Sequence, residues 1–137
     1  MRLEVTRRSD LAARALVHLG RTGGRTKAGQ LAAALETTAG FIPQVVSSLV
    51  AAGWVRSDPG PTGGYSLVTS LDDISILDVI ESVEGPTDSG RCVLADRPCG
   101  ATGPCALHHP WTRARGHLLQ ELADTPVAAL LAAGRAS

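Results

Sequence analysis

The sequence predicts a mainly α-helical protein with one β-hairpin and one irregular, cysteine-bearing loop. Apolar residues recur at helical spacing in several segments, a Pro- and Gly-rich turn separates two β-prone segments, and all three cysteines fall in one irregular stretch. The chain has 137 residues, of which 44% are hydrophobic and only 3% aromatic, so its core must consist mainly of aliphatic side chains. This composition argues against wholesale disorder and fits one domain or two small modules.

Three helices are predicted before the hairpin. They cover residues 9–19, about 27–35 and about 39–52. Ser9 is the expected N-cap of the first helix, and Gly20 is expected to end it. Thr37 and Thr38 are expected to cap the third helix, whose early Pro43 is tolerated.

The hairpin is predicted from residues 54–57 and 65–68, which flank the turn. Ser70 and Asp73 resemble a capping box that opens a helix ending before Gly85. Two further helices are expected after the irregular stretch 87–105: a long one over about 107–123 and a short one over 127–133. The long helix has an apolar seam at helical spacing, formed by Leu107, Trp111, Ala114, Leu118 and Leu122.

Charge is distributed unevenly although the formal net charge is zero. Residues 1–68 carry eight basic and four acidic side chains, a net charge of +4, whereas residues 69–137 carry five basic and nine acidic ones, a net charge of −4. A basic half joined to an acidic half indicates that the first half meets a polyanion. Random surface charge is the alternative explanation.

Three helices followed by a hairpin are the element order of a winged helix-turn-helix, in which the third helix enters the DNA major groove. A winged helix-turn-helix DNA-binding region is therefore predicted for residues 1–70. Its candidate DNA-binding residues are Lys27, Thr38, Gly40, Gln44, Ser47, Ser48 and Arg56, together with Gly63, Gly64 and Tyr65 of the wing. Gln44 can pair with adenine, and the hydroxyl groups can reach bases or phosphates. A solvated helix face is the alternative for Gln44 and the serines, and a tight turn is the simpler role of the two glycines.

The cysteines Cys92, Cys99 and Cys105 have six and then five intervening residues, within a loop rich in Pro and Gly. Pro98, Gly100, Gly103 and Pro104 allow such a loop to wrap around a small object. Thiolates favour zinc or iron–sulfur clusters, and either needs a fourth ligand. The candidates are His108, His109 and, if a partner subunit contributes, Asp10. Spacing alone does not separate zinc from iron, and three unligated thiols are a further alternative.

Other functional classes find less support in the sequence. No apolar run reaches the roughly 18 residues of a membrane span, and the first residues do not read as a signal peptide, so we expect a cytoplasmic protein that does not act at a membrane. No nucleophile–base pair stands near the cysteines, so we do not expect an enzyme.

These motifs together resemble the IscR/NsrR-type winged-helix transcription regulators of bacteria. The resemblance runs from the Met-Arg-Leu start and Asp10-Leu11-Ala12 through most of the chain. Its most specific parts are residues 53–57 leading to the Gly-Gly-Tyr wing at 63–65, the helix at 76–85 and the three-cysteine loop. It implies a homodimer in which the long helix crosses its mate, and an iron–sulfur cluster that controls DNA affinity. Residues 71–137 would then hold the cluster loop and the dimerisation helices.

Members of the family differ in the fourth cluster ligand. A His three residues after the last Cys, which is His108 in this sequence, accompanies a 2Fe–2S cluster; an Asp of the other subunit, which corresponds to Asp10, accompanies a 4Fe–4S cluster. This chain departs from the pattern by six rather than five residues between Cys92 and Cys99, and by two extra residues before Asp10. Both ligand sets therefore stay open.

We accordingly expect a dimeric repressor that reads a partly palindromic DNA operator through the third helix and the wing. The expected cofactor is a 2Fe–2S or 4Fe–4S cluster that senses redox state, nitric oxide or iron–sulfur status. A zinc-stapled winged-helix module without redox sensing is the alternative function.

Overall fold

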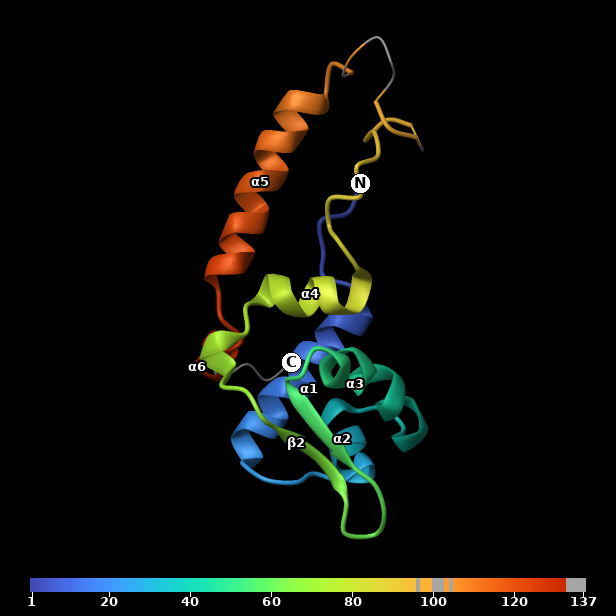
Figure 1. The fold of residues 1–137 in the computed structure, drawn as a ribbon, viewed down its shortest axis with the longest axis vertical. Helices are drawn as coiled ribbons and strands as arrows, with labels where there is room; N and C mark the ends of the chain where they lie inside the picture. Colours follow the sequence, from blue (N-terminus) through green and yellow to red (C-terminus); the bar gives the residue numbers. More distant parts are fainter. Residues whose placement is uncertain (96, 100–102, 104, 133–137) are drawn as a thin grey trace.

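The computed structural model describes residues 1–95, 97–99, 103 and 105–132. It confirms a mainly helical protein with one two-stranded antiparallel sheet (Figure 1). The elements are α1 (Arg7–Thr22), α2 (Ala28–Leu35), η1 (Ala39–Phe41), α3 (Ile42–Ala51), β1 (Val55–Asp58), β2 (Gly64–Leu67), η2 (Leu71–Asp73), α4 (Ile76–Glu84), α5 (His108–Asp124) and α6 (Ala128–Ala132). Helices α1–α3 and the hairpin form a winged helix-turn-helix, as the sequence predicts.

Helix α1 begins two residues before Ser9, so the prediction that Ser9 is the N-cap is wrong. The N-cap is Thr6, whose side-chain oxygen accepts a hydrogen bond from the backbone N–H of Ser9. Ser9 is buried instead, and its hydroxyl donates to the Glu84 carboxylate at the end of α4. The Ser9 hydroxyl therefore finds its hydrogen-bond partner 75 residues away in the sequence, and local sequence patterns do not predict such a contact.

Gly20 does not end α1, again contrary to prediction. The helix continues to Thr22 and ends at Gly23, which adopts a left-handed conformation with φ 67°. Gly20 leaves room for a neighbour, because a Cβ atom there would lie 2.7 Å from Cδ1 of Leu71 and the end of that side chain would have to shift. The glycine thus allows η2 to approach the helix closely.

Helix α2 and helix α3 occupy the predicted segments, but the predicted helix 39–52 is divided. Its first turn is the 3₁₀ helix η1, and α3 itself starts at Ile42 with Pro43 in its first turn. Proline lacks the N–H that an interior helix position requires, so an α-helical start just before Pro43 satisfies more backbone groups.

The hairpin pairs β1 with β2 in the register Val55 to Leu67 and Asp58 to Gly64. Thr26, in the turn between α1 and α2, forms a two-way backbone bridge with Tyr65, with N–O distances of 2.8 and 2.9 Å. The wing is therefore fixed to the turn between α1 and α2 as well as to its own partner strand.

The predicted capping box at Ser70 and Asp73 is replaced by two separate caps. Ser70 caps the 3₁₀ helix η2 by accepting from the backbone N–H of Asp72. The reciprocal capping box belongs to Ser75 and Asp78, and it opens α4. The predicted end of this helix before Gly85 is confirmed.

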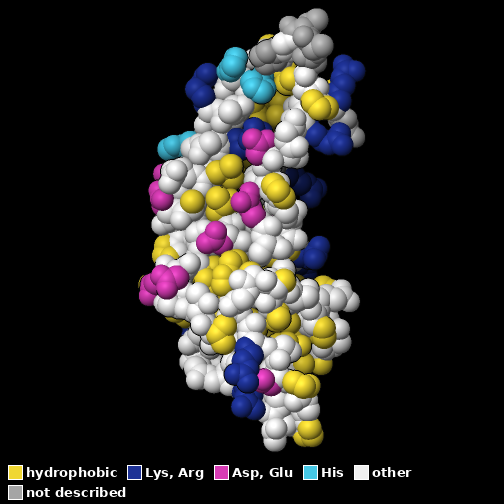
Figure 2. Space-filling model, viewed as in Figure 1, with side chains coloured by type: hydrophobic (Ala, Val, Ile, Leu, Met, Phe, Trp, Pro, Cys, Tyr) yellow, Lys and Arg dark blue, Asp and Glu magenta, His cyan; other side chains and the backbone are white. Residues whose placement is uncertain are grey.

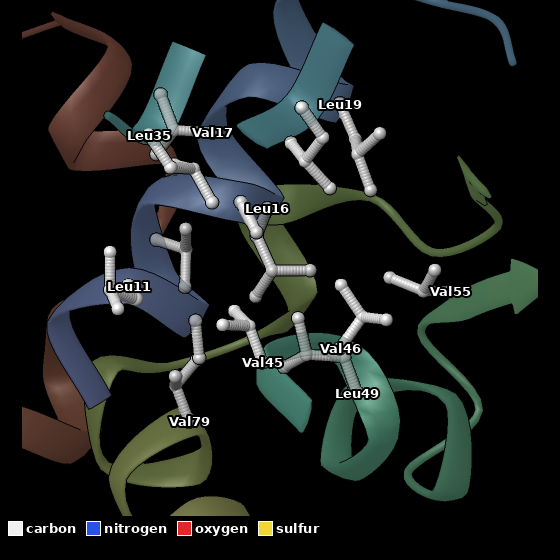
Figure 3. Packing of buried hydrophobic residues seen from close by; sticks show 14 of the residues in the cluster. Leu11, Leu16, Val17, Leu19, Leu35, Val45, Val46, Leu49, Val55 and Val79 are labelled. Carbon is white, nitrogen blue, oxygen red and sulfur yellow. The ribbon is translucent and has the colours of Figure 1, made fainter. Parts of the chain in front are cut away.

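One hydrophobic core lies around α1 and extends across the boundary predicted at residue 70. Figure 3 shows leucines of α1 facing Val45, Val46 and Leu49 of α3, with Val79 of α4 packed beside them. Val127, just before α6, is also fully buried in this core. The winged helix and the beginning of α4 therefore share one packed interior.

Helix α5 stands apart from this core and has no buried residue. In Figure 1 it extends away from the winged helix, and α6 returns the chain to α1. The long helix predicted over 107–123 is confirmed to within one residue at each end, and the short helix ends at Ala132; Ala133 lies outside the described residues.

Gly63→Ala should destabilise the hairpin. A Cβ atom at this position would lie 2.0 Å from the carbonyl oxygen of Asp58, and both atoms belong to backbone-anchored groups that cannot move away cheaply. Forced overpacking of this kind costs about 1–3 kcal/mol. We expect thermal unfolding, followed by circular dichroism, to show a melting temperature lower by several degrees.

Gly29→Ala is the matched control, because nothing lies within 4 Å of a Cβ atom at that helical position. Alanine is the better helix former, so this variant should be neutral or more stable. Equal melting temperatures for Gly63→Ala and the wild type would contradict the predicted clash.

Candidate metal centre and nucleic-acid interface

The cysteine loop connects the end of α4 to the start of α5 (Figure 1). The Sγ atoms of Cys92, Cys99 and Cys105 all lie within 4.8 Å of one another, although up to 12 residues separate them in sequence. All three thiols are free and half-buried. Gly100 and Pro104, expected to shape the loop, lie outside the described residues.

The donor atoms approach one another in two pairs. Sγ of Cys92 lies 3.7 Å from Sγ of Cys105, and Sγ of Cys99 lies 3.6 Å from Nδ1 of His108. Two thiolates on one tetrahedral metal, with bonds of about 2.3 Å, lie about 3.8 Å apart. Both pairs therefore have the separation of two ligands on one metal, and the donor set of three sulfur atoms and one nitrogen atom fits a metal centre.

The loop gives the thiols unequal acidity. A hydrogen bond from the backbone N–H of Leu94, at 3.4 Å, is the main cause that lowers the pKa of the Cys92 thiol. The pKa of Cys99 is raised: a hydrogen bond from the Cys105 backbone acts to lower it, but partial desolvation and the two neighbouring thiols outweigh that bond. Crowding of sulfur atoms thus opposes full ionisation until a cation compensates the charge.

A cavity of 240 Å³ adjoins the thiols and includes His108, Trp111 and Arg115 of α5 in its wall. The guanidinium of Arg115 forms an ion pair of 3.2 Å with Asp88, near the start of the loop. Figure 2 shows His side chains gathered over the same end of α5. The first half of α5 thus provides both a candidate ligand and an anchor for the loop.

Asp10 is not part of this centre within one chain. It lies on α1, forms an ion pair of 3.8 Å with Arg14, and borders a different cavity, of 310 Å³, together with His18 and Arg21. His109 is exposed and packs its ring against that of His108 at a centroid distance of 5.1 Å.

The predicted reading face of α3 is open to solvent. Gln44 and Ser47 are exposed, Ser48 is half-buried, and the Ser47 hydroxyl donates to the Gln44 carbonyl oxygen at 3.2 Å. Thr38 and Gly40, which precede α3, are exposed as well. The structure therefore places these five residues on the open side of the helix or just before it.

The other predicted DNA-binding residues lie at the wing and at the start of α2. Lys27 precedes α2 and is exposed, as is Arg56 on β1. The wing residues 63–65 also build the hairpin, because Gly63 and Gly64 leave no room for a Cβ atom and Tyr65 forms the backbone bridge to the turn before α2.

Sequence reasoning missed four charged residues of these two sites. Arg25 and Asp58 interact at the wing, and Asp88 and Arg115 join the cysteine loop to α5. Both pairs connect segments more than 25 residues apart, so no periodic pattern reports them. Their opposite charges were the only signal, and charge alone does not select a partner.

The winged helix and the thiol-rich loop together define a class: DNA-binding regulators that carry a candidate metal centre on a helical arm. Residues 5–133 match the Rrf2 family, described as "Iron-dependent Transcriptional regulator", and the chain belongs to this family. It is thus a transcriptional regulator rather than an enzyme. Among the described residues, no helix combines the length and apolar character needed to cross a membrane.

Relatives by sequence carry similar names. A Mycobacterium tuberculosis protein, named as an HTH-type transcriptional regulator, is 32% identical over 130 residues, which is 92% of this chain and 80% of that protein. A similarly named Aquifex aeolicus protein is 31% identical over 93 residues, which is 66% of this chain and 65% of that protein.

Solved structures share the fold. CymR, the global cysteine regulator of B. subtilis, has a TM-score of 0.74 at 24% identity, covering 94% of this chain and 96% of that chain. IscR of T. potens has a TM-score of 0.72 at 21% identity, covering 97% of this chain and 89% of that chain. The predicted winged-helix fold is therefore confirmed.

Arg115→Gln should loosen the cysteine loop. The lost ion pair is partly exposed and is worth about 0.2–1 kcal/mol, so the population of open loop should rise up to about fivefold. We expect tryptic cleavage after Arg91 to accelerate by the same factor, measured by mass spectrometry after limited digestion of the native protein. Arg113→Gln, an exposed position of the same helix, is the control; equal cleavage rates for both variants would contradict the anchoring role.

Proposed function

We propose that the chain is a homodimeric repressor whose operator affinity is controlled by an iron–sulfur cluster bound by Cys92, Cys99, Cys105 and His108. The observation that carries this proposal is the convergence of the three thiols, with His108 next to Cys99. Membership of a family described as iron-dependent supports iron rather than another metal. Zinc would fit the same donors chemically, and the experiment below separates the two.

We favour a 2Fe–2S cluster, which needs four protein ligands. Cys92, Cys99, Cys105 and His108 would supply them. A 4Fe–4S cluster with Asp10 of the partner subunit as a ligand is the alternative. Such a cluster supplies a redox-active centre that oxidants or nitric oxide can destroy.

The residues of the chain can transmit the state of the loop to the DNA-binding region. Glu84 ends α4 directly before the loop, and its carboxylate accepts hydrogen bonds from Thr6, the N-cap of α1, and from Ser9 of α1. Helix α4 also packs on α3. Ordering or release of the loop would therefore shift α4. In a dimer, this shift would change the spacing of the two DNA-binding regions. A tenfold change in DNA affinity requires only about 1.4 kcal/mol.

The DNA partner is proposed to be a double-stranded operator that is partly palindromic, because a two-fold dimer reads two half-sites. Residues 1–70 would read it: Gln44, Ser47 and Ser48 at base edges, and Lys27, Thr38 and Arg56 at phosphates. Gly40 and the wing residues 63–65 would let the backbone approach the duplex. A regulator of this kind works beside the chromosome, in the cytoplasm of a bacterium.

The dimer is proposed to form along α5, within the region 71–137. Leu107, the N-cap of this helix, is 38% exposed, and Leu118 within it is 42% exposed. Trp111 and Leu122, which belong to the same apolar seam, are only half-buried. Exposed apolar faces of this kind usually mark an interaction site. The α5 helix of a second copy of the chain would cover this face by crossing it.

Replacing His108 should weaken the cluster. Even groups that only orient metal ligands contribute about 10–100-fold to metal affinity, so loss of the imidazole should cost at least about tenfold. Anaerobically reconstituted His108→Ala should therefore retain less iron and sulfide and absorb less beyond roughly 400 nm than the wild type. His109→Ala, an exposed neighbour, is the matched control and should retain the cluster.

Two results would contradict this assignment. A colourless wild-type protein that contains zinc would favour the zinc-stapled module. Loss of the cluster in Asp10→Ala, with retention in His108→Ala, would identify the partner's Asp10 as the fourth ligand in place of His108.

Gln44→Ala should reduce sequence discrimination. A bidentate contact to a base contributes about 1–3 kcal/mol, which corresponds to about 5- to 150-fold in relative affinity. The test uses a duplex that the wild type selects from a random-sequence pool. We expect the affinity for this duplex, relative to unselected competitor DNA, to fall by that factor in the variant. Gln120→Ala, the same change on α5, should behave as the wild type. Undiminished discrimination by Gln44→Ala would remove the residue from the reading face.

A further inference from the structure

Two arginines share one aspartate at the base of the wing. Asp58, the last residue of β1, accepts a hydrogen bond from Nε of Arg56 at 3.0 Å, and its other carboxylate oxygen lies 3.9 Å from Nε of Arg25. Figure 2 shows Lys and Arg side chains beside an acidic one over the hairpin. The group has a net charge of +1.

The fold, rather than the ion pairs, holds this group together. Arg25 also donates from Nη1 to the carbonyl oxygen of Thr62 in the wing loop, at 2.6 Å. The next residue, Thr26, forms the two-way backbone bridge to Tyr65. Arg25 therefore stays next to the wing whether or not the carboxylate is present.

The two guanidinium groups are more accessible than the carboxylate between them. The side chains of Arg25 and Arg56 are 53% and 67% exposed, whereas that of Asp58 is 23% exposed. Exposed ion pairs add little to stability, so the carboxylate can be exchanged for another anion at small cost. Each guanidinium has five N–H donors, and the contacts above occupy only part of them.

We propose that Arg25, Asp58 and Arg56 form a phosphate-exchange site for the DNA backbone. In the free protein Asp58 holds both guanidinium groups toward the wing, and in the complex phosphodiester oxygens take its place on the outward N–H groups. The inference rests on the proposed binding of duplex DNA and adds Arg25 and Asp58 to the interface. Planar guanidinium groups suit phosphate well because they form paired hydrogen bonds.

Asp58 thereby acts as a specificity-determining residue. Its negative charge repels phosphates and occupies the arginines, which lowers the affinity for any duplex. Contacts of α3 with the correct bases can compensate for that loss, but a random sequence cannot. The wing then adds its full share of the DNA affinity only where α3 contacts the correct bases.

Asp58→Asn tests this assignment, because it removes the charge and nearly preserves the shape. Binding of a labelled, mixed-sequence 30-base-pair duplex is measured by fluorescence anisotropy between 50 and 200 mM KCl. Each phosphate contact adds about 0.9 to the slope of log affinity against log salt. For one or two added contacts we expect the slope to steepen by about 0.9–1.8, so that the variant loses about 3.5- to 12-fold more affinity than the wild type over this fourfold range of salt. At 50 mM KCl, Asp58→Asn should bind more tightly than the wild type.

Two further variants make the result specific. Asp73→Asn removes the same charge from an exposed position of η2 and should leave the slope unchanged. Arg25→Gln combined with Asp58→Asn should lose about half of the added slope. Equal or weaker binding by Asp58→Asn with an unchanged slope would show that Asp58 only supports the hairpin, and would overturn the inference alone. Failure of the wild type to bind any duplex would overturn the inference and the proposed DNA binding together.

Discussion

Burial of helix α1 is the constraint on which the rest of the structure depends. Its apolar face is covered on several sides, because α2, α3, α4, α6 and β2 all pack against it. Fully buried leucines at positions 11, 16 and 19 leave no room for these elements to move independently. Helix α3, the proposed recognition helix, and helix α4, which leads to the cysteine loop, are therefore positioned by the same surface. A displacement of either one must be accommodated at α1.

This shared surface explains which features the sequence could predict. The order of three helices and a hairpin follows from local signals: apolar spacing, the turn of Pro and Gly, and polar caps. The limits of α1 do not follow from such signals. Ser9 and Gly20 have the local character of a cap and a terminator, but both lie inside the helix, where Ser9 bonds to Glu84 and Gly20 leaves room for Leu71. Tertiary packing overrides local preference wherever a helix is covered on this many sides.

The candidate metal centre likewise has features that the sequence predicts and features that it does not. The residue types alone predict a thiolate metal site, because three cysteines and a nearby histidine are a suitable donor set. The structure brings the three Sγ atoms within 4.8 Å of one another. Their pairing could not be predicted, because an irregular loop has no period from which to calculate positions. The loop is fixed from outside: α4 and α5 hold its ends, and Arg115 binds Asp88 near its start. His108 meets Cys99 because it opens α5, and so depends on the same anchors.

The energies involved are compatible with control through these few contacts. A tenfold change in DNA affinity corresponds to about 1.4 kcal/mol, whereas one exposed ion pair contributes about 0.2–1 kcal/mol. The ion pair of Asp88 with Arg115 at the start of the loop is of this size. The hydrogen bonds of Glu84 with Thr6 and Ser9 at the end of α4 are a second polar link, but Ser9 is buried, so breaking this link costs about 1–3 kcal/mol. Both links are polar and lie outside the apolar cluster of the winged helix. A regulator built in this way can keep its winged helix rigid and still respond to a change in the cysteine loop.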